Sequence, residues 1–304
     1  MDASPEPHGS ADIARSEAIA RRSRSRLMAV ASGLDRRRYR LFCPAYASMR
    51  IIDDLVDEAL PDPASGVTGE AAQAALRIWL SSCEAALQGR LEPETGGHPV
   101  LVELAGVAVG LGMPARPWHL LAEALAEDIA GRAPADWAGF YRYSVGASGG
   151  PTEAFLNILA LRINDIRISV QASDVAAECA PVLAHYCYLV HIARDLVADA
   201  AGDPRLLSVP TRVLADLGMG KVDLRQAASQ ARVEPFLPVL LAVLAEAGRH
   251  VDAIERAEAA MRPVLDELGQ AGLARIVQAY RDLAREIAAS PHAWLERSMK
   301  ALAS

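Results

Sequence analysis

The segment IIDDLVDE, residues 51–58, places four acidic side chains in one of the most apolar parts of the chain. If this segment is helical, Asp53 and Asp57 lie one above the other on the face that also carries Tyr46, because residues four apart share a face. Asp54 falls on the adjoining stripe. Like charges at this spacing weaken a helix, so a favourable interaction must offset the repulsion between these carboxylates.

A second acidic stretch, HYCYLVHIARDLVADA at residues 185–200, has a similar design. Steps of three and four place four of its polar side chains on one helical face: Tyr188, His191, Asp195 and Asp199. A solvated acidic face is the ordinary interpretation of either stretch alone. Both stretches are too apolar for simple surface helices, however, and we therefore expect their carboxylates to border a cavity.

Divalent cations resolve the repulsion between carboxylates that lie one turn, about 6 Å, apart. Mg²⁺ is the natural candidate because it prefers oxygen ligands, keeps several waters, and is usually held by one or two carboxylates together with substrate phosphates. Two facing helices of this type predict a site where Mg²⁺ bridges the protein to a diphosphate. The candidate metal ligands are Asp53, Asp54, Asp57, Asp195, Asp199 and, from LLAEALAEDIAG, Asp128. For Asp128 a capping or surface role is the alternative.

The elements that must position these acids are predicted to be helices. The 304 residues are 52% hydrophobic and only 5% aromatic, with little β-branched alternation, which favours a nearly all-helical chain. Helical periodicity runs from about residue 13 to the end, and none of its interruptions is long enough for an interdomain linker. We expect a disordered tail at residues 1–12 and one all-α domain at residues 13–304.

Composition also argues against several classes of partner. The net charge of −7 makes nucleic acid an unfavourable partner. The N-terminus lacks the apolar core of a secretory signal, and by inspection no apolar run approaches the roughly 18–20 residues of a membrane span. The four cysteines show no metal-binding spacing. These features predict a cytoplasmic protein without a transmembrane segment.

Several segments resemble, in the same order, those of the squalene/phytoene synthase family. YRLFCPAYASMRIIDDLVDE resembles the first acidic signature of that family, and HIARDLVADA resembles the second. RSRSRLMAVASGL, AEDIAG, YRYSVGASGG, RLLSVP and QAYRDLAREI resemble further family segments. Each match is short, but together they span roughly residues 20 to 290.

The resemblance implies the all-α isoprenoid synthase fold, a helical bundle around a central cavity, and Mg²⁺-dependent ionisation of an allylic isoprenyl diphosphate. Arg50 and Arg194 match family arginines and are expected to hydrogen-bond phosphate oxygens. Tyr141 matches a family tyrosine near the reacting carbons, although a core tyrosine is the equal alternative. Ser23 and Ser25 either contact phosphate or cap a helix. The expected substrate-binding residues also include Tyr46, Tyr188 and Tyr280, and the expected catalytic residues are Asp53, Tyr141, His191 and Asp195.

The chain departs from the family pattern where a second isoprenyl diphosphate would bind. His191 replaces an asparagine, and imidazole is a poorer Mg²⁺ ligand than an oxygen. Gly149 and Pro151 alter a family turn and are expected to break the helix there. His191 is either a base near the acceptor or a hydrogen-bonded substitute for asparagine.

These departures favour transfer of a short prenyl group, such as dimethylallyl, from its diphosphate to an aromatic acceptor. Some members of this superfamily, in actinobacterial secondary metabolism, prenylate ring systems such as carbazoles. Head-to-head condensation with a second isoprenyl diphosphate is the first alternative. A non-catalytic family member that acts as a partner subunit is the second alternative.

Overall fold

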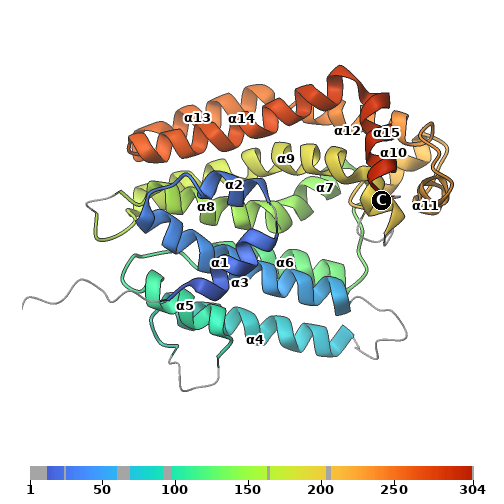
Figure 1. Ribbon diagram of the computed structural model, residues 1–304. Coiled ribbons are helices and arrows are strands. Elements are labelled where there is room, and N and C mark those ends of the chain that lie inside the picture. The colour runs from blue at the N-terminus through green and yellow to red at the C-terminus, as the bar shows by residue number, and fades with distance from the viewer. Residues whose placement is uncertain are drawn as a thin grey trace, which may run out of the picture.

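The computed structural model describes residues 12–23, 25–59, 69–91, 97–162, 165–202 and 207–302. Within these ranges the chain forms helices joined by loops and contains no strand, which confirms the predicted all-α class (Figure 1). Nearly all of the tail expected at residues 1–12 lies outside the described ranges. The helices are α1 (Ala14–Arg22), α2 (Arg26–Ala31), α3 (Arg36–Ala59), α4 (Gly69–Leu87), α5 (Pro99–Ala108), α6 (Arg116–Ile129), α7 (Trp137–Ser144), η2 (Val145–Gly149), α8 (Gly150–Ala160), α9 (Val170–Ala201), α10 (Thr211–Asp216), α11 (Lys221–Ser229), α12 (Phe236–Gly248), α13 (Val251–Met261), η3 (Arg262–Val264), α14 (Glu267–Ala289) and α15 (Pro291–Leu302).

The long helix α9 is the centre of the bundle. It begins at Ser169, whose hydroxyl accepts a hydrogen bond from the backbone of Ala172 at 3.1 Å, and it packs against α8, α11, α12, α13 and α14. By length and composition alone α9 is apolar enough to cross a membrane, and half of its most apolar window is buried inside the fold. The expectation that no apolar run approaches the length of a membrane span is therefore wrong for this helix by length and composition, although its part at residues 185–200 was correctly expected to be helical. Contacts with so many neighbouring helices account for its apolar composition, as expected for a core helix.

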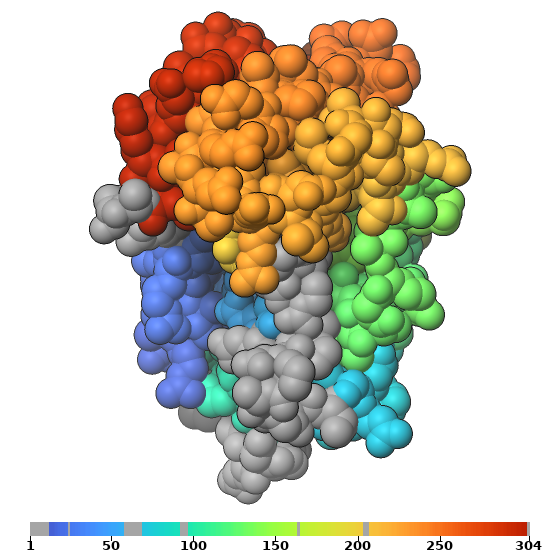
Figure 2. Space-filling view, turned by 90° about the vertical axis from the view of Figure 1, so that its right-hand side faces the viewer, coloured from blue at the N-terminus to red at the C-terminus, as the bar shows by residue number. Residues whose placement is uncertain are grey.

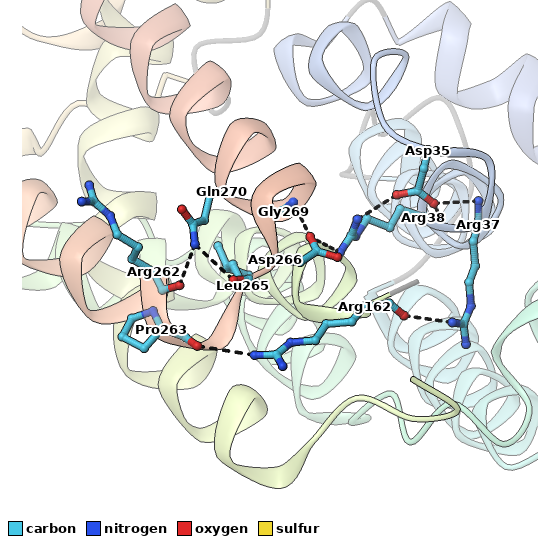
Figure 3. A network of polar contacts seen from close by, with 10 residues as sticks. All are labelled: Asp35, Arg37, Arg38, Arg162, Arg262, Pro263, Leu265, Asp266, Gly269 and Gln270. Atoms are coloured by element: carbon cyan, nitrogen blue, oxygen red, sulfur yellow. Dashed lines mark hydrogen bonds and ion pairs between the residues drawn. The ribbon is translucent and has the colours of Figure 1, made fainter. Parts of the chain in front are cut away.

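A buried arginine joins the beginnings of α3 and α14 (Figure 3). The Arg38 guanidinium, which is fully buried, forms ion pairs with Asp35 at 2.8 Å and with Asp266 at 2.7 Å. Asp266 also caps α14 by accepting a hydrogen bond from the backbone of Gly269 at 2.8 Å. A buried charge is tolerated only when it is paired in this way, so the two helix ends are held in a fixed relative position.

The expected helix break at Pro151 does not occur. The chain instead passes from α7 through one turn of π-helix, η2, directly into α8. Pro151 lies in the first turn of α8, directly after the π-turn, whose altered hydrogen-bond pattern accommodates a residue without an N–H. Glycine is required in this turn because a Cβ at Gly146 would collide with the carbonyl oxygen of Leu120 in α6. The π-turn therefore packs tightly against α6, and such turns are common at functional sites.

Candidate active site

The two acid-bearing helices meet at one large cavity. Its volume is about 730 Å³, and its lining includes Asp53 and Asp57 near the end of α3 and Asp199 near the end of α9. In Figure 1 the C-terminal ends of α3 and α9 lie toward the same side of the molecule. Figure 2 faces that side, with the blue N-terminal segment and the green segment on opposite sides and the orange segment above them. The expected pairing of the two distant acidic segments is thus present in the fold.

The cavity carboxylates affect one another electrostatically. Burial, together with repulsion from Asp195 and from Asp57 on the other helix, raises the pKa of Asp199 to about 7. Asp57 keeps solvent contact at the open side of the cavity, yet loss of hydration and repulsion, first from Asp53, raise its pKa to about 7. Burial is also the first cause of the raised pKa of Asp128, about 6, and of the raised pKa of Asp53. A bound cation would reverse these shifts.

These acids form an oxygen-rich site that suits a hard cation. Within the described part of the chain, no three His, Cys, Asp or Glu side chains come close enough to hold a metal ion by themselves. Mg²⁺ does not require such a cage, because substrate phosphates and waters supply its remaining ligands. The cavity-lining carboxylates that fit this chemistry are Asp53, Asp57, Asp128 and Asp199.

Asp54 and Arg50 occupy the stripe beside the metal-facing acids. Arg50 lines the cavity and forms ion pairs with Asp53, at 2.8 Å, and with Asp54. Asp54 is not among the residues that line the cavity. Its side chain is about half exposed, with 47% of its surface accessible. The structure therefore does not place Asp54 with the metal ligands, because the helical twist turns it away and pairs it with Arg50.

On α9 the expected metal ligand Asp195 is engaged by its own helix. Its carboxylate accepts two hydrogen bonds from Arg194, one of them at 2.7 Å from Nε, and lies 3.1 Å from Nε2 of His191. Asp195 does not line the cavity, whereas Arg194, His191 and Asp199 do. The expected metal and catalytic roles of Asp195 therefore do not match its position, which instead orients Arg194 toward the cavity.

Both ring nitrogens of His191 contact charged side chains. Arg194 donates to Nδ1 at 3.1 Å, and Nε2 faces Asp195. Burial and the adjacent Arg194 lower the pKa of His191 to about 4, so the ring is neutral at neutral pH. In this arrangement the basic lone pair of the neutral ring, on Nδ1, accepts the hydrogen bond from Arg194. The geometry thus matches the hydrogen-bonded substitute for asparagine, and a role as a base requires Arg194 to move.

Tyr141 does not face the cavity, contrary to the expectation. Its hydroxyl donates a hydrogen bond to Glu246 and lies 2.8 Å from Nε2 of His250, both near the α12–α13 junction. Its ring packs against His185 with a centroid distance of 4.8 Å. Tyr143 lines the cavity instead, and its hydroxyl donates to Asp128 at 3.0 Å. Residues two apart on a helix point to nearly opposite sides, so only one of the two tyrosines can face the reacting carbons.

We expect Tyr143→Phe and Tyr141→Phe to have different effects. Tyr143→Phe removes a hydrogen-bond donor from Asp128, so kcat/KM should fall about tenfold, the value of one hydrogen bond to a charged group, with little loss of stability. Tyr141→Phe removes one of the two partners of the buried Glu246 and leaves it only Arg249, so stability should fall by about 1–2 kcal/mol with kcat/KM nearly unchanged. Steady-state kinetics and denaturant titration of the two variants measure both effects. The opposite pattern would show that Tyr141, rather than Tyr143, acts in the reaction.

The remaining expected substrate-binding residues all line the cavity: Ser23, Ser25, Tyr46, Tyr188 and Tyr280. Ser25 also caps α2 by accepting a hydrogen bond from the backbone of Met28 at 3.0 Å. The Tyr188 hydroxyl lies 2.9 Å from that of Ser208. Both proposed roles of Ser25 are therefore compatible with its position.

Sequence reasoning missed several polar residues of the cavity wall. Arg26, Arg132, Tyr143, Ser208 and Lys221 all line it. Most of them lie in loops or at helix ends, where no periodic pattern marks them. Arg26, Tyr143 and Ser208 did carry a signal, because they belong to the segments RSRSRLMAVASGL, YRYSVGASGG and RLLSVP, whereas Arg132 and Lys221 did not.

Known proteins share both the sequence pattern and the fold. Residues 19–303 match the family model described as squalene/phytoene synthase. The crystal structure of a dehydrosqualene synthase in complex with ligand has a TM-score of 0.67 and 17% identity, covering 95% of each chain. The crystal structure of squalene synthase HpnC from Alicyclobacillus acidocaldarius has a TM-score of 0.64 and 18% identity, covering 91% of this chain and 95% of that one. No curated protein sequence is similar enough to count as a match. At these identities the two structures show a shared fold.

Proposed function

This chain belongs to the squalene/phytoene synthase family of isoprenoid-synthesising enzymes, and from that premise we propose that it transfers a prenyl group from an allylic isoprenyl diphosphate to an aromatic acceptor. The observation that carries the proposal is the meeting of Asp57 and Asp199, from distant parts of the chain, at one cavity. Two acidic helix ends facing one pocket suit a diphosphate bound through divalent cations.

The donor end of the cavity is built from acids and arginines. Mg²⁺ held by Asp53, Asp57, Asp128 and Asp199 would neutralise the diphosphate as the allylic C–O bond breaks and the electron pair leaves with oxygen. Arg50 and Arg194 line the same cavity and would donate hydrogen bonds to phosphate oxygens. Apolar walls beyond them exclude water from the allylic cation.

The acceptor would lie beside His191, whose imidazole lines the same cavity. An electron-rich ring attacks the allylic cation, a new C–C bond forms, and the ring carbon then loses its proton. When Arg194 turns to the diphosphate it withdraws from His191 Nδ1, now 3.1 Å away, and frees that lone pair. His191, neutral at neutral pH, is then available to take the proton.

Two observations favour head-to-head condensation as a second candidate function. The cavity volume of about 730 Å³ equals about 24 water-sized groups at roughly 30 Å³ each, which exceeds what a five-carbon donor and its diphosphate fill. Arg132 and Lys221 also line the cavity and carry the charge that a second diphosphate needs. An aromatic acceptor would use the same space. The non-catalytic alternative is disfavoured because four carboxylates are kept at the cavity wall.

Product analysis separates the two reactions. The enzyme is supplied with Mg²⁺ and dimethylallyl, geranyl, farnesyl or geranylgeranyl diphosphate, with and without a carbazole or indole acceptor. We expect a prenylated aromatic product that forms only with the acceptor and a short donor. One diphosphate should be released for each molecule of this product. A C30 or C40 hydrocarbon formed without acceptor would replace this proposal by head-to-head condensation.

A further inference from the structure

The cavity has a polar end and an apolar end along the same helices. On α14, Tyr280 lies close enough to Arg194 to influence its pKa, and Leu273 lies seven residues earlier, about 10 Å along the axis. On α3, Tyr46 precedes Asp53 by a similar distance, and all five of these residues line the cavity. A prenyl chain whose diphosphate is held at the acids therefore extends toward Leu273.

Leu273 lies between this cavity and a second, smaller cleft. The second cleft has a volume of about 280 Å³ and lies between α14 and the α13–η3 segment. Leu273 contributes to the walls of both spaces and is only 3% exposed. The other residues of the cleft are Glu258, Arg262, Gln270, Ala271 and Ala274. The leucine thus lies at the partition between a mainly apolar cavity and a cleft whose walls are both polar and apolar.

The backbone around Leu273 has little freedom to move. A Cβ at Gly272 would lie 2.7 Å from a methyl group of Leu159, and a Cβ at Gly269 would lie 2.5 Å from the Leu159 carbonyl oxygen. These glycines let α14 approach the end of α8 closely, and the Arg38–Asp266 contact of Figure 3 holds the start of the same helix. Packed backbone of this kind deforms little, so the side chain at position 273 sets the size of the space.

We propose that Leu273 closes the apolar end of the cavity and limits the length of the prenyl chain that the donor carries. This inference rests on the proposed function, because it assigns the donor chain to the apolar end of the same site. Shortening the side chain joins the cavity to the second cleft and makes room for a further isoprene unit.

The test compares Leu273→Ala and the milder Leu273→Val with Leu283→Ala. Leu283 is buried in the same helix, 2% exposed, and does not line the cavity, so its truncation controls for the general loss of a core leucine. The affinities of dimethylallyl, geranyl, farnesyl and geranylgeranyl thiodiphosphates are measured by calorimetry with Mg²⁺. In both Leu273 variants the affinity ratio of the next longer donor to the preferred donor should rise, about tenfold or more for Leu273→Ala. Leu283→Ala should keep the wild-type ratios.

Two outcomes would overturn the inference, and they are distinguishable. Unchanged ratios in Leu273 variants that still bind the preferred donor would remove the length-limiting role and leave the proposed function intact. Failure of the wild-type protein to bind any of the four compounds would remove the proposed function and this inference with it.

Discussion

An Asp53→Asn variant should lose at least about two to three orders of magnitude in kcat, the scale on which removal of a single electrostatic stabiliser acts, while it keeps its helical fold. The substitution preserves the shape of the side chain but removes a negative charge from the cavity wall. It leaves Arg50, 2.8 Å away, without one of its partners and weakens the attraction for cations. Diphosphate release under steady-state conditions, together with circular dichroism, measures the loss and the fold.

Asp54→Asn is the matched control. Asp54 is the next residue on the same helix and also pairs with Arg50, but it does not line the cavity. We expect its kcat to stay within a few-fold of wild type, because the surface ion pair contributes little. Equal losses in the two variants would show that the net charge of the helix, rather than the face that meets the cavity, sustains the reaction.

The sequence was sufficient for the acid-bearing helices because helical periodicity determines which residues share a face. Asp53, Asp57 and Asp199 were therefore correctly expected at one cavity, since an apolar helix with one acidic stripe must bury its other faces. Periodicity does not determine how far a helix is rotated about its axis relative to its neighbours. That rotation decided that Tyr143 rather than Tyr141 faces the cavity, and tight packing of the π-turn against α6 fixes it.

Competing local contacts explain the other differences. Asp195 has the spacing of a metal ligand, but the adjacent Arg194 reaches it with two hydrogen bonds, and sequence spacing cannot rank these two partners. The pairing of Arg38 with Asp266 joins residues 228 positions apart, and no local pattern predicts it. Lys221 was missed because it enters the cavity wall from the first turn of a short helix.

Mg²⁺-dependent binding of a prenyl thiodiphosphate should strengthen by roughly one to two orders of magnitude between about pH 6 and pH 8, because metal binding to protonated carboxylates must release their protons. The pKa values of Asp57 and Asp199 are raised to about 7 and that of Asp128 to about 6, so at the lower pH most of these groups carry a proton. Calorimetry or thermal shift across this range measures the slope.

The same shifts fix the sign of the pH dependence of stability without metal. An aspartate whose folded pKa is raised above its unfolded value of about 4 stabilises the fold below that unfolded value, and this contribution is lost as pH rises through about 7. The metal-free protein should therefore lose stability between about pH 4 and pH 8 through these groups, and Mg²⁺ with the thiodiphosphate should restore the most stability at the upper end of this range.

The thiodiphosphate also titrates, so the decisive quantity is the difference between variants in how binding affinity changes with pH. Asp54→Asn should keep the wild-type slope of affinity against pH, whereas Asp57→Asn combined with Asp199→Asn should flatten it. A slope that survives the double substitution would come from the ligand, and the cation would then not be held by these two carboxylates.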